Sequence, residues 1–132
     1  SSHLTVRADP EKLMQVLVNL LANAVKFTDA VHAGVLPARI DVWCEAEGAF
    51  GAYRVRDSGI GIPADKLASI FEPFTQVTSG LTRPHDGAGL GLAISRDLAR
   101  GMGGDLTVTS QVGEGSIFTV TLPLGQDLET AV

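Results

Sequence analysis

The sequence is poor in cysteine and has no cluster of basic residues. Cys44 is the only cysteine among 132 residues, so the chain can form neither an internal disulfide nor a metal site made of several cysteines. The formal net charge is −5, and the lysines and arginines are dispersed along the chain. A nucleic-acid-binding surface needs grouped basic residues to offset phosphate charge, so we expect no nucleic-acid partner.

Long hydrophobic runs are also lacking. The most apolar stretch, 13–25, is interrupted by Gln15, Asn19 and Asn23, whereas a membrane-spanning helix needs about 20 mostly apolar residues. The first residues do not show the basic start and apolar run of a secretory signal. Because 45% of the residues are hydrophobic, the chain can bury one core, and we expect a single globular domain in the reducing environment of the cytoplasm.

The pattern of apolar residues predicts helices interleaved with hairpin strands. Asp9 and Pro10 are a typical helix start, and the periodicity predicts a helix to about Phe27. A short helix is expected after Pro63, with Phe71 inward as a core anchor. Another is expected after a glycine-rich run at 87–91, and its inward face should carry Ala93, Ile94, Leu98 and Met102. Alternating apolar residues predict strands at 39–47, 50–56, 106–110 and 116–122, and the first strand should have one covered face. This order indicates an α+β two-layer sandwich, with a mixed, mostly antiparallel sheet packed on about three helices.

One edge of the first helix carries polar side chains. Gln15, Asn19, Asn23 and Lys26 fall within an arc of roughly 80° when they are placed on a helix. An amide oxygen such as that of Asn23 is a suitable magnesium ligand beside phosphates and water. Alternatively, Asn19 and Asn23 could cap backbone groups of a neighbouring segment, and the spacing leaves both interpretations open.

A carboxylate and two glycines follow the second predicted strand. Asp57 could accept a hydrogen bond from the exocyclic amine of adenine, and Gly59 and Gly61 would let the backbone approach the ring. Guanine would present an acceptor at that position and be repelled. The same residues could also form an ordinary Asp-Ser-Gly turn.

The glycine run resembles a phosphate-binding loop that opens a helix. Gly87, Gly89 and Gly91 would leave backbone amides free to face an anion. However, the Walker pattern GxxxxGK[ST] is absent, and a polar loop precedes the run where a Rossmann fold has an apolar strand. Neither a P-loop nor a Rossmann site is therefore predicted.

Five segments in this order resemble the ATP-binding catalytic domain of bacterial sensor histidine kinases. That domain has the Bergerat-type ATP-binding fold, which is shared with DNA gyrase, the heat-shock chaperone ATPases and the mismatch-repair ATPases. The matching segments are Gln15–Thr28 (the N box), Asp57–Ile62 (the first glycine box), Phe71–Phe74 (the F box), Gly87–Ile94 (the second glycine box) and the closing segment around Gly113–Ser116. The resemblance covers a core of about 5–124 and leaves 125–132 as a tail.

The resemblance implies a role for each matching residue. Asn23 would bind magnesium, Asn19 and Lys26 would face the phosphates and act in catalysis, and Asp57 would bind the adenine amine. Ser116 would place a hydroxyl close to Asp57, and 75–86 would form a lid that orders around bound phosphates. The remaining nucleotide-binding residues would be Gly59, Gly61, Ile62, Phe74, Gly87, Gly89, Leu90 and Gly91.

Within this superfamily, the residue four positions before the one that matches Asn23 distinguishes enzymes that hydrolyse ATP from those that transfer its phosphoryl group. Gyrase-like ATPases have a glutamate there as general base, whereas this chain has Asn19, and an amide cannot take a proton. The resemblance therefore implies a monomeric domain that holds Mg-ATP for a histidine on a separate helical dimerisation domain, with a response regulator as the indirect partner. The alternatives are an anti-sigma-type protein serine kinase and a regulatory nucleotide-binding module.

Overall fold

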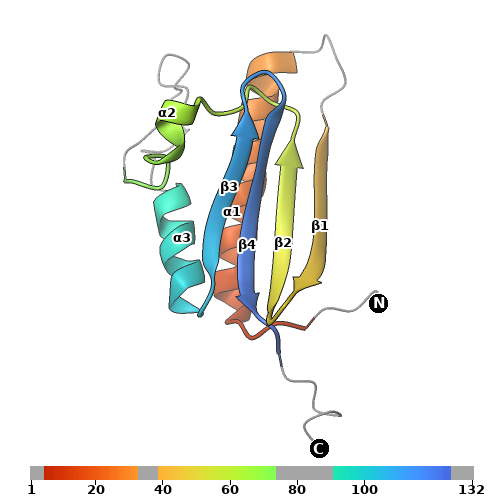
Figure 1. The fold of residues 1–132 in the computed structure, drawn as a ribbon, viewed down its shortest axis with the longest axis vertical. Coiled ribbons are helices and arrows are strands. Elements are labelled where there is room, and N and C mark those ends of the chain that lie inside the picture. Colours follow the sequence, from red (N-terminus) through yellow and green to blue (C-terminus); the bar gives the residue numbers. More distant parts are fainter. Residues whose placement is uncertain (1–4, 33–38, 74–90, 126–132) are drawn as a thin grey trace, which may run out of the picture.

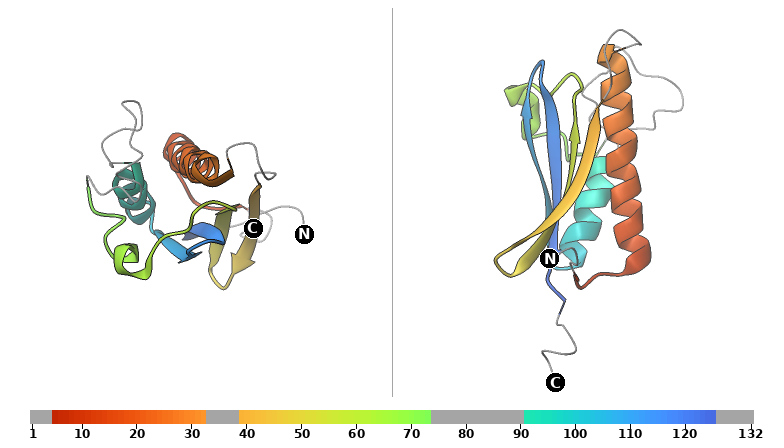
Figure 2. Two further views of the ribbon diagram at one scale, coloured as in Figure 1. Left: turned by 90° about the horizontal axis from the view of Figure 1, so that it is seen from above. Right: turned by 90° about the vertical axis from the view of Figure 1, so that its right-hand side faces the viewer.

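The computed structural model describes residues 5–32, 39–73 and 91–125 and has two layers (Figure 1). One layer is a sheet of β1 (Ile40–Glu47), β2 (Phe50–Asp57), β3 (Asp105–Gln111) and β4 (Gly115–Pro123). The other contains α1 (Pro10–His32) and α3 (Gly91–Gly101), which lie side by side on one face of the sheet (Figure 2). The short helix α2 (Ala64–Leu67) lies near the end of β3. The predicted α+β sandwich is confirmed.

All described strand pairs are antiparallel, in the order β1-β2-β4-β3. The register places Asp57 opposite Ser116, at the same end of the sheet as the turn between β3 and β4. Val6 and Leu124 form an isolated bridge that joins the two ends of the described chain. The topology therefore brings the end of β2 and the β3–β4 turn together, although about 60 residues separate them.

The core lies between the sheet and the two long helices. It contains the periodic residues of α1 and the inward residues of β2, β3 and β4. The fully buried members include Val16, Leu20, Val55, Leu106, Phe118, Val120 and Leu122. The alternation predicted for the last strand, Phe118, Val120 and Leu122, is thus confirmed. None of the described helices is long and apolar enough to span a membrane.

One expectation about α1 and one about β1 were wrong. Helix α1 continues to His32, beyond the predicted end at Phe27, because no glycine or proline interrupts the chain before Gly34. Strand β1 does not have a covered apolar face: Val42 is 55% exposed and Cys44 is exposed. The reason is topological, since β1 is an edge strand and α1 packs over β2.

Candidate functional site

Asp57 is a buried carboxylate at the end of β2. Its exposed fraction is 2%, and Oδ1 accepts a hydrogen bond of 2.9 Å from the Gly59 amide. Oδ2 is also buried but has no hydrogen-bond partner. Desolvation raises the pKa of this carboxyl, against the opposing effect of the Gly59 and Ser116 backbone amides. An unpaired buried acceptor of this kind fits a ligand that brings a hydrogen-bond donor, such as an exocyclic amine.

The glycines after Asp57 allow close backbone contacts on both sides of the loop. A Cβ at Gly59 would lie 2.7 Å from the carbonyl group of Phe27 in α1. Gly61 has a φ of +75°, and a Cβ there would lie 2.2 Å from the carbonyl oxygen of Gln111 in β3. The loop is therefore held between α1 and the β3–β4 turn, and both contacts require glycine.

A hydroxyl network ties this loop to the β3–β4 hairpin. Ser110 Oγ accepts from the Ile62 amide at 2.7 Å and lies 2.7 Å from Ser116 Oγ. Ser116 is buried opposite Asp57, as expected, but its hydroxyl is bonded to Ser110. Sequence reasoning missed Ser110. The alternation of Leu106 and Val108 could have identified it as the next inward residue of β3.

The amide edge of α1 points toward α3. Asn19 Nδ2 donates a hydrogen bond of 3.0 Å to the hydroxyl of Ser95, which is completely buried. Asn19, Asn23 and Lys26 are all half-buried, and Lys26 Nζ lies 5.6 Å from the centre of the Phe27 ring. Within the part of the chain that the structure describes, the Asn19 amide therefore bonds to a side chain of the neighbouring helix and not to a backbone group.

One residue of the face predicted to be inward in α3 lies outside the core. Ala93 is buried and Leu98 and Met102 pack against the core, as expected, whereas Ile94 is 40% exposed. Ser95 and Ala99 are fully buried, and the apolar pattern did not include Ser95 because serine is polar. Ser95 is therefore a second residue of the site region that sequence reasoning missed.

Phe71 anchors the chain after α2 to the core. Its ring meets that of Phe118 edge to face, with centroids 6.4 Å apart, and the guanidinium of Arg96 lies 4.5 Å from its centre. The expectation that Phe71 is a core anchor is confirmed. Gly91 is the first residue of α3. Phe74, Gly87, Gly89, Leu90 and the predicted lid at 75–86 lie outside the described residues.

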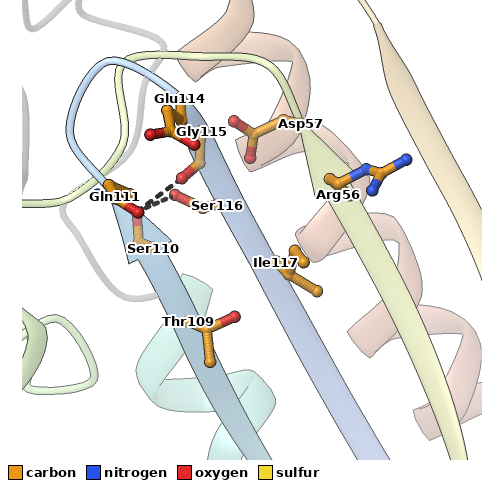
Figure 3. A pocket seen from close by; sticks show the side chains of 9 residues that line it. All are labelled: Arg56, Asp57, Thr109, Ser110, Gln111, Glu114, Gly115, Ser116 and Ile117. Atoms are coloured by element: carbon orange, nitrogen blue, oxygen red, sulfur yellow. Dashed lines mark hydrogen bonds between the residues drawn. The ribbon is translucent and has the colours of Figure 1, made fainter.

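A pocket of about 350 Å³ lies beside Asp57, at the same end of the sheet (Figure 3). Arg56, Thr109 and Ile117 line it from the face of the sheet that carries no helix, and Asp57, Ser110 and Ser116 line its other side. The amides of α1 lie on the helical face. The pocket therefore borders Asp57 from the open face, and the candidate nucleotide site is formed on the helical face by α1, the Asp57 loop and the start of α3.

Thr28 has the second unpaired buried polar atom among the described residues. Its side chain is 1% exposed, and Oγ1 has no hydrogen-bond partner. We predict that Thr28→Val, which replaces the hydroxyl by a methyl of similar size, stabilises the unliganded domain by about 1 kcal/mol or more, because an unpaired buried hydroxyl is costly. Urea unfolding without nucleotide is the measurement. A loss of stability would mean that the hydroxyl is paired.

The raised pKa of Asp57 predicts a pH dependence of stability. The folded state binds the Asp57 proton more tightly than the unfolded state does, so its contribution to the free energy of unfolding falls as pH rises from about 4 through the raised pKa. Above that range the ionised buried carboxylate is destabilising. Urea unfolding at a series of pH values should show that Asp57→Asn gains stability relative to wild type across this window. Parallel pH profiles would contradict the burial of an ionisable group.

Comparison with known proteins places these features in one family. Residues 8–126 match the family model described as histidine kinase-, DNA gyrase B- and HSP90-like ATPase. The chain is 45% identical over 121 residues to the sensor histidine kinase RcsC of Escherichia coli K12, and 48% identical over 118 residues to the aerobic respiration control sensor protein ArcB of the same strain. The two matches span 92% and 89% of this chain, but only 12% of RcsC and 14% of ArcB.

A solved structure agrees with the sequence matches. Full-length ShkA in complex with AMPPNP superposes with a TM-score of 0.77 at 35% identity, over 96% of this chain and 24% of ShkA. The match with the family model covers most of the chain, and the relatives are sensor kinases. The chain therefore belongs to the histidine kinase-, DNA gyrase B- and HSP90-like ATPase family, as an ATP-binding catalytic domain of the sensor histidine kinase type.

Proposed function

We propose that this chain binds Mg-ATP and donates the γ-phosphoryl group to a histidine on a separate helical dimerisation domain of a two-component sensor kinase. The observation that carries this function is the buried, unpaired Oδ2 of Asp57, next to a glycine loop that permits close approach. Adenine brings the donor that this acceptor lacks. A response regulator would receive the phosphoryl group from the histidine in a later step.

The phosphates and the magnesium ion would lie against the polar edge of α1. The amide oxygen of Asn23 would bind Mg²⁺, an ion that commonly takes one or two protein oxygens together with phosphates and water. Asn19 and Lys26 would face the phosphates, and Lys26 would offset the charge that develops during transfer. Gly59, Gly61, Ile62 and Ser116 shape the adenine end, and Phe74, Gly87, Gly89, Leu90 and Gly91 complete the site from the segment that leads into α3.

Phosphoryl transfer is favoured over hydrolysis because Asn19 cannot act as a general base. During transfer, the bond between the γ-phosphorus and the bridging oxygen of ADP breaks, and a bond forms to the nitrogen of an incoming imidazole. A neutral imidazole nitrogen needs no base to expose its lone pair, whereas water does. The residues of this site thus fit a histidine nucleophile better than water.

Labelled ATP tests this function. The domain should transfer the γ-phosphate to the helical phosphoacceptor domain of its own kinase, giving an acid-labile, base-stable product, and a His→Gln variant of the acceptor should stay unlabelled. The domain alone should turn over ATP very slowly and should not label itself. Label on a serine would favour the serine kinase alternative, and ATP binding without transfer would favour the regulatory module.

We predict that Asn23→Ala uncouples nucleotide binding from magnesium. The amide oxygen of Asn23 is the ligand that we assign on the α1 edge, and the described residues contain no cluster of three or more His, Cys, Asp and Glu side chains. Titration calorimetry with ATP should therefore show that added Mg²⁺ strengthens binding to the wild type and has little effect on the variant. If the variant keeps the wild-type magnesium dependence, the ligand is another residue.

The domain should work as a monomer on the cytoplasmic side, where ATP is available. Residues 5–124 would form the catalytic unit and 125–132 a tail. Sedimentation of the purified chain with and without Mg-ATP tests the monomeric state; a nucleotide-dependent dimer would contradict it.

A further inference from the structure

The hydrogen bond between Asn19 and Ser95 joins the polar edge of α1 to the helix that follows the glycine run. Asn19 Nδ2 lies 3.0 Å from Ser95 Oγ, across 76 positions of sequence. Ser95 is completely buried, while Asn19 is half-buried and reaches the edge of the site. Helices α1 and α3 pack against each other along this contact. The serine hydroxyl is therefore surrounded by the core, whereas the asparagine is the less buried partner.

An asparagine side chain has two chemically opposite ends. The amide nitrogen donates hydrogen bonds, whereas the oxygen accepts them and can face a cation or a metal-bound water. Rotation by 180° about the last torsion exchanges the two ends at almost no steric cost. A neighbouring group that accepts from the nitrogen therefore determines which end of the amide faces the rest of its surroundings.

We propose that Ser95 is a positioning residue that keeps the carbonyl oxygen of Asn19 directed toward the magnesium ion and its bound water. This inference rests on the proposed function, since it concerns the same Mg-ATP site. With one N–H held by Ser95, Oδ1 of Asn19 accepts a hydrogen bond from metal-bound water next to the ligand Asn23. Without the serine hydroxyl, the amide turns, and its nitrogen, a poor neighbour for a cation, occupies that position part of the time.

Magnesium dependence is the readout that separates positioning from packing. We expect Ser95→Ala to raise the Mg²⁺ concentration needed for half-maximal ATP binding about 3- to 10-fold, the effect of one hydrogen bond. Adenosine, which has no phosphates and needs no metal, should bind the variant as it binds the wild type. Fluorescence or calorimetric titration of the whole chain gives both values. A purely structural role would weaken adenosine and Mg-ATP alike.

A carboxylate at position 19 provides a second test. Both oxygens of an aspartate are acceptors, so Asn19→Asp removes the need for orientation while it keeps the size of the side chain. The effect of Ser95→Ala on magnesium dependence should therefore disappear when both substitutions are combined. If Ser95→Ala raises the Mg²⁺ concentration needed for half-maximal ATP binding equally with asparagine and with aspartate at position 19, Ser95 does not act through the amide.

The outcomes distinguish this inference from the function on which it rests. A wild-type chain that does not bind Mg-ATP would overturn the proposed function itself. A wild-type chain that binds Mg-ATP, together with a Ser95→Ala variant that keeps the normal magnesium dependence, would overturn only the role of Ser95. Thermal unfolding of each variant in the binding buffer checks that the binding values refer to folded protein.

Discussion

Asp57→Asn should lower the affinity for ATP about 10- to 150-fold while it makes the unliganded domain more stable. The substitution keeps the shape of the side chain, and its remaining oxygen can still accept from the Gly59 amide. However, a donor replaces Oδ2, the acceptor for which the described residues provide no hydrogen-bond partner. Loss of a hydrogen bond to a charged group costs about 1.5–3 kcal/mol, which corresponds to this range of affinity. Titration calorimetry and urea unfolding at neutral pH measure the two effects.

Thr109→Ala is the matched control for the position of the site. Thr109 lines the pocket on the open face of the sheet, at the same end as Asp57, and it is exposed. We expect no change in ATP affinity, since the nucleotide site lies on the helical face. A large loss of ATP affinity with Thr109→Ala would place the nucleotide in the pocket on the open face instead.

Gly61→Ala should lower the free energy of unfolding by about 2–5 kcal/mol. The residue has a φ of +75°, which costs about 1–2 kcal/mol for an L-residue, and its Cβ would lie 2.2 Å from the Gln111 carbonyl oxygen. Relief of such a contact by a backbone shift costs about 1–3 kcal/mol more. The shift would also move the Asp57 loop away from the β3–β4 hairpin, so ATP affinity should fall even under conditions in which the variant is folded.

Gly48→Ala separates the two causes. Gly48 has a φ of +61° in the turn between β1 and β2, and a Cβ there would meet nothing within 4 Å. Its substitution should therefore lower the free energy of unfolding only by the cost of a positive φ for an L-residue, about 1–2 kcal/mol, and leave ATP affinity unchanged. Equal losses for the two variants in urea unfolding would mean that the close approach at Gly61 contributes nothing.

Patterns within single segments were enough to predict most of the architecture. Apolar periodicity located α1 and the strands, and the position of Asp57 directly after a strand followed from the alternation before it. Local pattern failed for the two features that depend on packing partners. The apolar side of β1 is exposed because the fold leaves that edge uncovered, and Ser95 is buried because α1 offers it a polar partner.

The sequence predicted most residues of the candidate site but not the hydrogen bonds between them. The sequence offered Asp57 as an adenine acceptor, but the residues by themselves favoured an ordinary Asp-Ser-Gly turn. The two interpretations differ in whether one carboxylate oxygen is buried without a partner, which only the packing of α1, β2 and β4 around it determines. Likewise, the bonds of Ser110 to Ile62 and Ser116 depend on strand register, which no single segment specifies.

The most direct test of adenine recognition at Asp57 compares ATP with ITP, in which a carbonyl oxygen replaces the exocyclic amine. Titration calorimetry with Mg²⁺ should show that the wild-type chain binds ATP about 10-fold or more tightly than ITP, because ITP places an acceptor against the Asp57 carboxylate. In Asp57→Asn, which offers a donor instead, this preference should vanish or reverse. Equal binding of ATP and ITP by the wild type, or an unchanged preference in Asp57→Asn, would contradict the central claim that the buried carboxylate selects adenine.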